Sequence, residues 1–423
     1  MKILVIGKSA REQAFIEKIS QSPRADEIFC IPGNPAIAQF ATCVNIALDD
    51  LTSITEFAKE KEIDLTIALD EYVIQNGITN IFQQEGLKIF APTKEAAQIA
   101  TSRAFAKKFL YKNKIATPKY GVFDKESSAI DYIKKSPYPL IVKYDHLAHQ
   151  DSFLCNHFNR AKTIISEVFH DVQKKVIIEE FLEGDYITLS VLTDGYNVLP
   201  LPYVHEYKRV LDGEGGAITK GVGAYTPVGK ITPEIESIIA QEIIFPLVDA
   251  MRDSGISYEG FLSASLLLQP DGKVNAIEFL PTLSIAEATC VLQLIEDDLL
   301  DIIYAASEGA LEDVYENIYT SDDAVVSVGL LSGSYPTNPR LESIVKGIEL
   351  IDDDESIELY YNDVGMNSYY EISTTGGRPF FLTARAATLN KARENVYENI
   401  DYIKYSGKNY RKDIAKFTIS KEF

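Results

Sequence analysis

The sequence has few cysteines and no apolar run long enough to cross a membrane. Its four cysteines are scattered over 423 residues without a CxxC pair: Cys30, Cys43, Cys155 and Cys290. We therefore expect reduced thiols in a cytoplasmic protein rather than disulfides. No apolar stretch approaches the roughly 20 residues that a membrane helix needs. The segment Met1 to Gly7 is shorter than the apolar part of a signal peptide and is typical of a buried strand.

Positive charge is also scarce. The chain has 41 Lys and Arg against 62 Asp and Glu, a formal net charge of −21. A chain this acidic repels phosphate backbones, so we expect no nucleic-acid partner, and small anionic ligands need local positive sites. The hydrophobic content of 46% is typical of a packed globular protein. The length predicts several domains, because single cores stop growing well below this size.

The signatures of several enzyme classes are missing as well. No GxSxG, HExxH or Walker A sequence is present, which leaves serine hydrolases, zincins and P-loop enzymes without support. The turn after the first strand fails the GxGxxG pattern. A helix that starts there, next to Lys8, Ser9 and Arg11, is able to hold a phosphate or carboxylate, although a solvated turn explains the sequence equally well.

Strands and helices alternate through the N-terminal region, residues 1–104. The pattern predicts an open parallel sheet covered by helices, with ligands at the carboxyl ends of the strands. The expected strands are Lys2–Ile6, Glu27–Ile31, Asp64–Leu69 and Lys88–Phe90, and the expected helices are Arg11–Ile19, Leu51–Glu60 and Val73–Gln84.

The pattern changes in the second region, residues 105–320, which a helix from Lys94 to Lys114 leads into. A small α+β lobe is expected over about 116–192, and a hairpin turn at 269–272 follows a helix from Glu234 to Arg252. Residues 321–423 predict a third, mainly β domain that ends in a helix. The strands expected in the small lobe are Tyr138–Lys143, Lys175–Glu180 and Tyr186–Leu192.

Charged residues end three of these strands. Lys143 closes an apolar strand, where it either meets a nucleotide phosphate or extends its ammonium group into solvent. Glu179 and Glu180 close the next strand and precede apolar residues, a layout able to flank an adenine. Glu278 is a candidate ligand for Mg²⁺, which prefers oxygen donors. Leu280, on the same strand face, cannot coordinate a metal, and a solvated strand end is the alternative for Glu278.

Two further groups of residues have an open interpretation. Lys208 and Arg209 enter a glycine-rich segment, residues 212–225, which either brings backbone close to a ligand or forms a flexible surface connection. His146, His149, Cys155 and His157 lie close together in sequence. Their spacing matches no zinc pattern, so we expect a polar hairpin loop there.

Several of these segments occur together in a recognisable order. On this basis the sequence resembles phosphoribosylamine–glycine ligases (glycinamide ribonucleotide synthetases), which are ATP-grasp enzymes of purine biosynthesis, over nearly its whole length. The most telling segments are Gly86-Leu87-Lys88-Ile89-Phe90-Ala91-Pro92-Thr93, Ser102-Arg103-Ala104-Phe105, Ile178-Glu179-Glu180-Phe181-Leu182, Tyr207-Lys208-Arg209, Gly223-Ala224-Tyr225-Thr226-Pro227, Ile277-Glu278-Phe279 and Gly376-Gly377-Arg378.

The resemblance implies an ATP-grasp fold with an N-terminal parallel α/β domain and a C-terminal, mainly β domain. It also implies that ATP phosphorylates a carboxylate and that an amine then attacks the acyl phosphate, with ATP and Mg²⁺ as cofactors. The implied nucleotide contacts are Arg103 and Lys143 to the phosphates, Glu179, Glu180 and Leu182 around adenine, and Asp185 near the ribose. Glu278 would bind Mg²⁺, while Arg11, Glu71, Lys208 and Arg209 would face the phosphoribosyl and amino-acid end.

Departures from the family pattern fall where the chemistry happens. The glycine-rich lid has lost its glycines over Lys143 to Phe153, Tyr186 replaces a ribose-binding glutamate, and Leu280 replaces a metal-binding asparagine. Each lost charge-stabilising group costs a factor of roughly a hundred in rate. Lys220 and His149 are candidate replacements.

Other departures exchange one polar residue for another. Arg103 stands where the family usually has a lysine, and Gln13 stands where the family has a histidine after the first strand. Lys220 takes the place of a glycine in the sequence that forms the family's glycine site.

Three interpretations of the function therefore stay open. The first is an ATP-dependent ligase with altered substrates, the second is unaltered glycinamide ribonucleotide synthesis with replacement ligands, and the third is a non-catalytic paralogue that binds a nucleotide, metabolite or partner protein. We expect a monomer or a small homo-oligomer that acts on small molecules, with no membrane partner.

Overall fold

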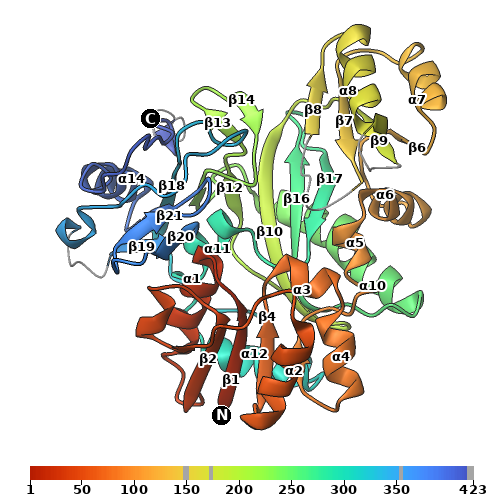
Figure 1. The fold of residues 1–423 in the computed structure, drawn as a ribbon. Helices are drawn as coiled ribbons and strands as arrows, with labels where there is room; N and C mark the ends of the chain where they lie inside the picture. Colours follow the sequence, from red (N-terminus) through yellow and green to blue (C-terminus); the bar gives the residue numbers. More distant parts are fainter. Residues whose placement is uncertain (146–151, 171–174, 352–355, 417–423) are drawn as a thin grey trace.

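The N-terminal part of the molecule is built on a parallel sheet. A computed structural model describes residues 1–145, 152–170, 175–351 and 356–416 (Figure 1). Five strands pair in the order β3-β2-β1-β4-β5, all in parallel, which confirms the predicted open sheet. Their bounds are β1 Lys2–Gly7, β2 Glu27–Pro32, β3 Thr42–Cys43, β4 Leu65–Ala68 and β5 Ile89–Phe90.

Helices cover both faces of this sheet, because β1 is apolar on both sides. Ile3 and Val5 face α1 (Ala10–Ile19), whereas Leu4 and Ile6 face the helices α2 (Leu51–Glu60), α3 (Glu71–Gln75) and α4 (Ile78–Gln84). A continuous apolar strand buried on both faces is typical of a parallel sheet.

Two predicted helices are broken in the structure. The single helix expected over Val73–Gln84 is wrong, because Gly77 has a φ of 85° and separates α3 from α4. The helix expected over Lys94–Lys114 is likewise two helices, α5 (Gln98–Thr101) and α6 (Arg103–Lys112). Ser102 lies between them in extended conformation, and its hydroxyl accepts a hydrogen bond from the backbone N–H of Phe105 as the N-cap of α6.

A small lobe follows, with four strands in the order β6-β9-β7-β8. The strands are β6 Tyr120–Phe123, β7 Leu140–Tyr144, β8 Ser152–Cys155 and β9 Val176–Glu180, and the helices α7 (Glu126–Ile133) and α8 (Phe158–His170) cover one face. The assignment of Tyr186–Leu192 to this lobe is wrong. That segment belongs to β10 (Asp185–Asp194), which pairs with β16 in the central sheet.

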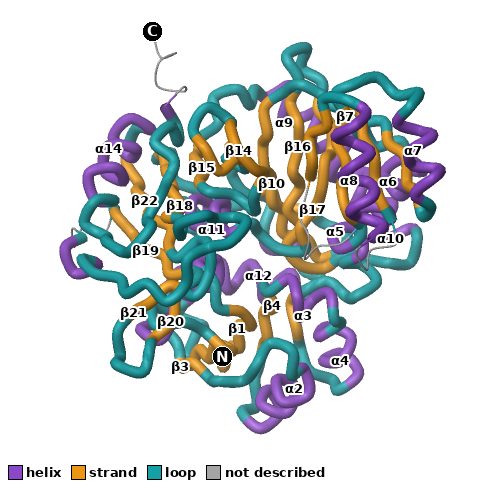
Figure 2. The backbone as a smooth tube through the Cα atoms, turned by 45° about the horizontal axis from the view of Figure 1, so that its top comes forward, coloured by secondary structure: helices purple, strands orange, loops and turns teal. Residues whose placement is uncertain are grey.

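The central sheet (Figure 2) has nine strands, and Thr188, Ser190, Ser263 and Ser265 make one of its faces polar where β10 and β16 pair. Along β10, Ile187, Leu189 and Val191 contribute to an apolar core, while Thr188 and Ser190 alternate with them on the other face. The other strands are β11 Val198–Pro200, β12 Val204–Glu206, β15 Gly223–Thr226, β16 Glu259–Leu268, β17 Val274–Leu280, β18 Ala324–Leu330, β19 Ile357–Tyr361 and β22 Phe380–Ala386.

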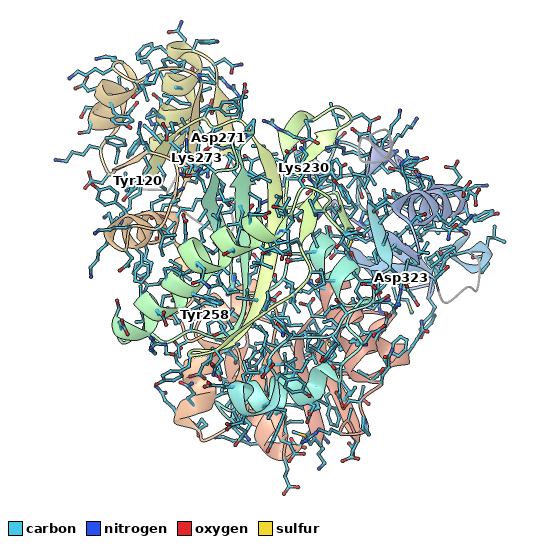
Figure 3. All side chains as sticks on the ribbon, turned by 180° about the vertical axis from the view of Figure 1, so that it is seen from behind. Tyr120, Lys230, Tyr258, Asp271, Lys273 and Asp323 are labelled. Carbon is cyan, nitrogen blue, oxygen red and sulfur yellow. The ribbon has the colours of Figure 1, made fainter. Side chains whose placement is uncertain are left out.

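A long helical segment covers the apolar face of β10 and β16. It runs from α9 (Pro233–Ile239) through a π-helical turn to α10 (Phe245–Asp253). Behind it, Tyr258 is fully buried and donates a hydrogen bond to the carbonyl oxygen of Phe261 at 2.9 Å. The predicted hairpin between β16 and β17 is confirmed, and Asp271 and Lys273 lie at its turn (Figure 3).

The C-terminal region is mainly antiparallel sheet, as predicted, but its strands extend the central sheet. β18 pairs with β15 on one side and with β22 on the other. The helix α14 (Leu389–Asn399) packs on β18 and β22, and a short hairpin joins β20 (Val364–Met366) to β21 (Ile372–Thr374). Between the N-terminal domain and the central sheet lie α11 (Ile285–Val291) and α12 (Leu299–Ser307). Over the residues that the structure describes, no helix is long and apolar enough to cross a bilayer.

Phe261 of β16 joins the N-terminal domain to the central sheet. Its ring makes edge-on contacts with Phe15 of α1 at 6.2 Å and with Phe90 of β5 at 5.6 Å between centroids. We expect Phe261→Ala to lower the free energy of unfolding by about 3–5 kcal/mol, since it leaves a cavity at this junction. Urea unfolding followed by circular dichroism measures the loss. Tyr369→Ala, at a side chain that is 81% exposed, is the matched control, and equal losses for both variants would contradict the assignment.

Candidate functional site

Three ionised side chains from different elements meet in a buried cluster. Glu179 of β9 lies between Lys107 of α6 and Lys143 of β7, with carboxylate–ammonium distances of 3.2 Å and 2.9 Å. All three side chains are at most 4% exposed. Because residues alternate along β7 and β9, Lys143 and Glu179 point away from the helices α7 and α8. The cluster therefore lies on the face of the small lobe that these two helices leave open.

The ion pairs decide the charge state of this cluster. Burial favours a protonated Glu179, but the two ammonium groups outweigh it and lower the pKa of that carboxyl. Burial lowers the pKa of Lys107 to about 8. Lys107 also donates a hydrogen bond to the hydroxyl of Thr117 at 2.6 Å. Each charge in the cluster therefore has an opposite charge beside it.

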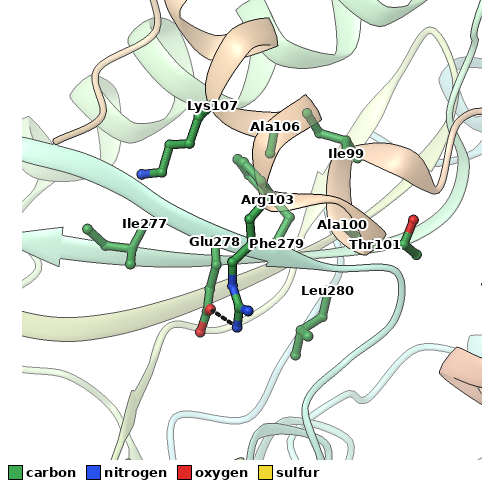
Figure 4. Close-up of a pocket in the computed structure, with 10 residues that line it drawn as sticks. All are labelled: Ile99, Ala100, Thr101, Arg103, Ala106, Lys107, Ile277, Glu278, Phe279 and Leu280. Carbon is green, nitrogen blue, oxygen red and sulfur yellow. Dashed lines mark ion pairs between the residues drawn. The ribbon is translucent and has the colours of Figure 1, made fainter. Parts of the chain in front are cut away.

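A second charged group follows on the polar face of the central sheet (Figure 4). Lys208 binds Glu278 of β17 at 2.8 Å and the hydroxyl of Ser265 at 2.9 Å. The guanidinium group of Arg103 lies 3.6 Å from the other oxygen of Glu278 and donates to the carbonyl oxygen of Tyr144 at 2.7 Å. Burial opposes ionisation of Glu278, but Lys208, Arg103 and Lys143 lower its pKa.

A cavity of about 330 Å³ opens next to Lys208 and Glu278, where the three regions of the chain meet. Its walls carry five cations and five carboxylates together with neutral polar groups, and we call it the mixed-charge cavity. The charged lining residues are Lys8, Arg11, Lys208, Lys220 and Arg378, and Asp70, Glu71, Glu206, Glu278 and Asp363. Such a lining suits a ligand that carries both an anionic group and an amine.

Arg11 is fixed in this wall by three contacts. Its guanidinium group binds Glu12 at 2.8 Å, donates to the carbonyl oxygen of Leu283 at 2.9 Å and lies 3.7 Å from Glu71. Lys220 approaches the other oxygen of Glu71 at 3.6 Å. Although burial opposes it, these cations lower the pKa of Glu71.

The wall is held together by contacts across domains. The side-chain amide of Gln13 donates to the carbonyl oxygen of Leu359 at 3.2 Å, and its oxygen accepts from the N–H of Tyr361 at 2.7 Å. Arg378 donates to the carbonyl oxygens of Lys220 and Gly221, both at 2.9 Å. The N-terminal domain and the glycine-rich segment are thereby both anchored to the C-terminal region.

The structure brings most of the predicted site residues together. They form one continuous charged path that leads from the small lobe to the mixed-charge cavity, where Arg11 lies. The members of this path are Lys143, Glu179, Arg103, Glu278 and Lys208. Ser9 of the predicted anion-binding turn also lines the cavity, but its hydroxyl is engaged with Glu12 at 2.5 Å.

Other predicted residues lie apart from this path. Glu180 accepts the backbone N–H of Lys119 at 2.8 Å, and Leu182 is half-buried after β9. Asp185 lies on the opposite face of β10 from Tyr186 and pairs with Lys230. Arg209 starts β13 (Arg209–Leu211), which pairs with β14 (Gly215–Ile218), and it donates to the carbonyl oxygen of Gly216 at 2.8 Å.

The lid segment is only partly described. His146 and His149, with the residues up to position 151, lie outside the described residues. The strands on either side, β7 and β8, pair as an antiparallel hairpin, as predicted. Cys155 is buried at the end of β8, and all four cysteines are free thiols. Nδ1 of His157 accepts the backbone N–H of Arg160 at 3.3 Å.

Tyr186 takes the place of the expected ribose-binding glutamate. Its ring centroid lies 5.9 Å from the ammonium group of Lys208. The residue is 38% exposed, so part of it lies open to solvent.

Three buried charged residues of this region, Lys107, Glu206 and Glu287, are not among the predicted site residues. Lys107 follows Arg103 by four residues, and this spacing places both side chains on one face of α6, a signal that sequence reasoning could have used. Glu206 lines the mixed-charge cavity, where the hydroxyl of Ser284 donates to it at 2.9 Å, and Glu287 is fully buried nearby. Ser284 and Glu287 have the S-x-x-E spacing of a capping box, which the structure forms at the start of α11, whereas no sequence pattern distinguishes Glu206 from a solvated carboxylate.

The donor set around Glu278 does not match a magnesium site. Among the described residues, no group of three His, Cys, Asp or Glu side chains is arranged to hold a metal ion. Mg²⁺ requires oxygen ligands in nearly octahedral geometry. Here both oxygens of Glu278 face cations, and Leu280 next to it has no donor atom.

Comparison with known families gives one consistent result. Three profiles of the phosphoribosylglycinamide synthetase family match consecutive parts of the chain: the N domain at residues 1–100, the ATP-grasp (A) domain at 101–281 and the C domain at 325–417. A phosphoribosylamine–glycine ligase of Caldanaerobacter subterraneus subsp. tengcongensis is 35% identical over 98% of this chain and 99% of its own length. One of Vibrio vulnificus is 33% identical over 100% and 99%.

Solved structures share the fold. The crystal structure of a phosphoribosylamine–glycine ligase of Thermotoga maritima has a TM-score of 0.83 at 24% identity, over 98% of this chain and 100% of its own. The biotin carboxylase domain of a 2-oxoglutarate carboxylase of Hydrogenobacter thermophilus, solved with MgADP, ADP and bicarbonate, has a TM-score of 0.73 at 14% identity, over 97% and 91%. At these identities the likeness establishes the architecture alone.

Glu287 makes the stability of the site depend on pH. Burial raises its pKa from 4.5 to about 7, so in this window the folded state binds a proton that the unfolded state lacks. Stability must therefore fall as pH rises through the window. We expect Glu287→Gln to remove roughly 2 kcal/mol of this fall between about pH 5 and 8, measured by urea unfolding at each pH. If the free energy of unfolding falls by the same amount with pH in the variant and in the parent, Glu287 is not the group responsible.

Proposed function

The chain belongs to the phosphoribosylglycinamide synthetase family, and we propose that it joins the carboxylate of an amino acid to the amine of phosphoribosylamine or an analogue, at the expense of ATP. The observation that carries this proposal is the position of Lys208. Its ammonium group borders both the charged path between the lobes and the mixed-charge cavity. A ligase that passes a phosphoryl group from ATP to a carboxylate needs the two ligands to meet at such a point.

The proposed reaction has two steps. A carboxylate oxygen attacks the γ-phosphorus of ATP, the bond to the bridging oxygen breaks, and ADP leaves. The amine then attacks the carbonyl carbon of the acyl phosphate, loses a proton, and inorganic phosphate leaves. Arg103, Lys143 and Lys208 lie where negative charge on the phosphates needs stabilisation, which is the largest demand in phosphoryl transfer.

The mixed-charge cavity is the proposed place of the two substrates. Arg11, Lys220 and Arg378 offer cations to a carboxylate or phosphate, while Glu71 and Glu206 offer acceptors to an amine. Lys220 stands where the family has a glycine in its glycine site, and it adds a cation there. Because this cation changes the site, the amino-acid substrate has to be identified by experiment, and glycine is the first substrate to test.

A non-catalytic paralogue is the weaker alternative, because the curated relatives that match the chain over its full length are named as ligases. We further propose that the protein works in the cytoplasm as a monomer or small homo-oligomer and that its domains are 1–104, 105–320 and 321–423.

A phosphate-release assay tests the proposed function. The full chain is mixed with ATP, MgCl₂, glycine and phosphoribosylamine formed in place from ribose 5-phosphate and ammonia. We expect phosphate release that requires both the amino acid and the amine. The same assay with each of the other common amino acids then identifies the preferred carboxylate. No release above the rate with ATP alone, across all the amino acids, would contradict a ligase.

Lys143→Met tests the nucleotide end of the site. Removing this cation should lower kcat/KM for ATP roughly a hundredfold, because one charge-stabilising group is worth about 3 kcal/mol in such a site. Lys134→Met, at an exposed lysine of the same lobe, is the matched control and should leave kcat/KM unchanged. Equal rates for the two variants would remove Lys143 from the nucleotide site.

A further inference from the structure

The carboxylate of Glu278 is engaged by cations on the polar face of the central sheet. Lys208 binds one of its oxygens at 2.8 Å, and Arg103 approaches the other at 3.6 Å. A magnesium ion at this position would have to displace both cations from the carboxylate. It would then add two positive charges beside an ammonium and a guanidinium group that have lost this partner. Without a polyphosphate beside it, a magnesium ion therefore gains little from this carboxylate.

The neighbouring positions offer a metal no compensation. Leu280 is the next residue on the same face of β17 (Figure 4) and, like Glu278, it lines the mixed-charge cavity. Ser265 pairs with Glu278 in the sheet, and its hydroxyl oxygen accepts a hydrogen bond from Lys208 at 2.9 Å. A hard cation that keeps a near-octahedral oxygen shell would find Glu278 engaged by two cations, and Glu206, the other carboxylate near Lys208, accepting a hydrogen bond from the hydroxyl of Ser284 at 2.9 Å.

Positive charge is nevertheless concentrated between the lobes. Each of the two carboxylates on the charged path pairs with two cations: Glu179 with Lys107 and Lys143, and Glu278 with Arg103 and Lys208. A polyphosphate is the complementary ligand for such a row of cations. Lysine and arginine supply the N–H donors that phosphate oxygens accept, and arginine binds them in a bidentate manner.

We propose that this cleft binds the polyphosphate of a nucleoside di- or triphosphate without a divalent cation, with Lys208, Arg103 and Lys143 in the place of the metal. This inference rests on the proposed function, since it concerns the same nucleotide site. The inference adds one point to the proposed function. A solved structure of the same fold holds its nucleotide as MgADP, whereas side chains take the place of the metal in this chain.

Calorimetric titration of the full chain with ATP tests the proposal. We expect the dissociation constant in EDTA to be equal to, or smaller than, the constant measured in excess MgCl₂. Binding that is at least tenfold tighter with MgCl₂ would overturn the proposal while leaving the ligase function intact. Absence of ATP binding under both conditions would overturn the proposal and the proposed function together.

Two variants at Leu280 separate side-chain neutralisation from metal binding. Leu280→Asn supplies the missing oxygen donor, and we expect this variant to gain binding of Mn²⁺ in the presence of ADP, observed by electron paramagnetic resonance of the free ion. Leu280→Ala removes the same apolar side chain without adding a donor, and it should bind as little Mn²⁺ as the parent chain. Stoichiometric Mn²⁺ binding by the parent chain would overturn the proposal.

Lys208→Met tests the replacement directly. The loss of a charged contact should weaken ATP binding in EDTA by about tenfold or more. The variant leaves Glu278 with one cationic partner fewer, which frees this carboxylate for Mg²⁺. The loss of ATP affinity relative to the parent chain should therefore be smaller in MgCl₂ than in EDTA. An equal loss of affinity in both buffers would overturn the proposal that Lys208 takes the place of a metal ion. Circular dichroism and urea unfolding show whether the variant is folded in both buffers.

Discussion

The pairing of Glu179 with Lys107 and Lys143 is the interaction on which the proposed nucleotide end of the cleft depends. Burying one carboxylate without partners costs several kcal/mol, and removing one member of a buried pair costs about 3–5 kcal/mol. Since the three residues come from α6, β7 and β9, the cluster fixes the helix against the small lobe. Arg103, one turn before Lys107 on α6, is thereby held against Glu278 of the central sheet.

The elements that the sequence predicts well are those with a simple period. The apolar run of β1 and the alternation in β10 follow from burial on two faces or on one, and Lys143 and Glu179 stand out because they interrupt such runs. Tertiary pairing is what the sequence does not reveal. Tyr186–Leu192 has the same strand pattern as the small-lobe strands, and only its partner β16 places it in the central sheet. Lys107 was missed because an amphipathic helix normally carries lysines on its solvated face.

Several departures from the family pattern have acquired partners of their own. Gln13, in place of a histidine, both donates to and accepts from the backbone of β19. Arg103, in place of a lysine, reaches the carbonyl oxygen of Tyr144 as well as Glu278. Lys220, in place of a glycine, pairs with Glu71. Each of these three replacements has a partner in the structure, whereas the buried hydroxyl of Thr282 and one oxygen of Glu287, in the altered segment after Glu278, have no hydrogen-bond partner among the described residues.

Lysine and a metal ion solve the same electrostatic problem with different geometry. A magnesium ion holds its ligands in a fixed octahedron, whereas an ammonium group on a flexible stem tolerates a range of phosphate positions. Lys208 binds Glu278 and Ser265 and lies near the ring of Tyr186, so its position is set by the sheet. In our proposal, Leu280 leaves Glu278 without a neighbouring oxygen ligand for a metal, and the ring of Tyr186 lies beside the ammonium group that takes the place of the metal.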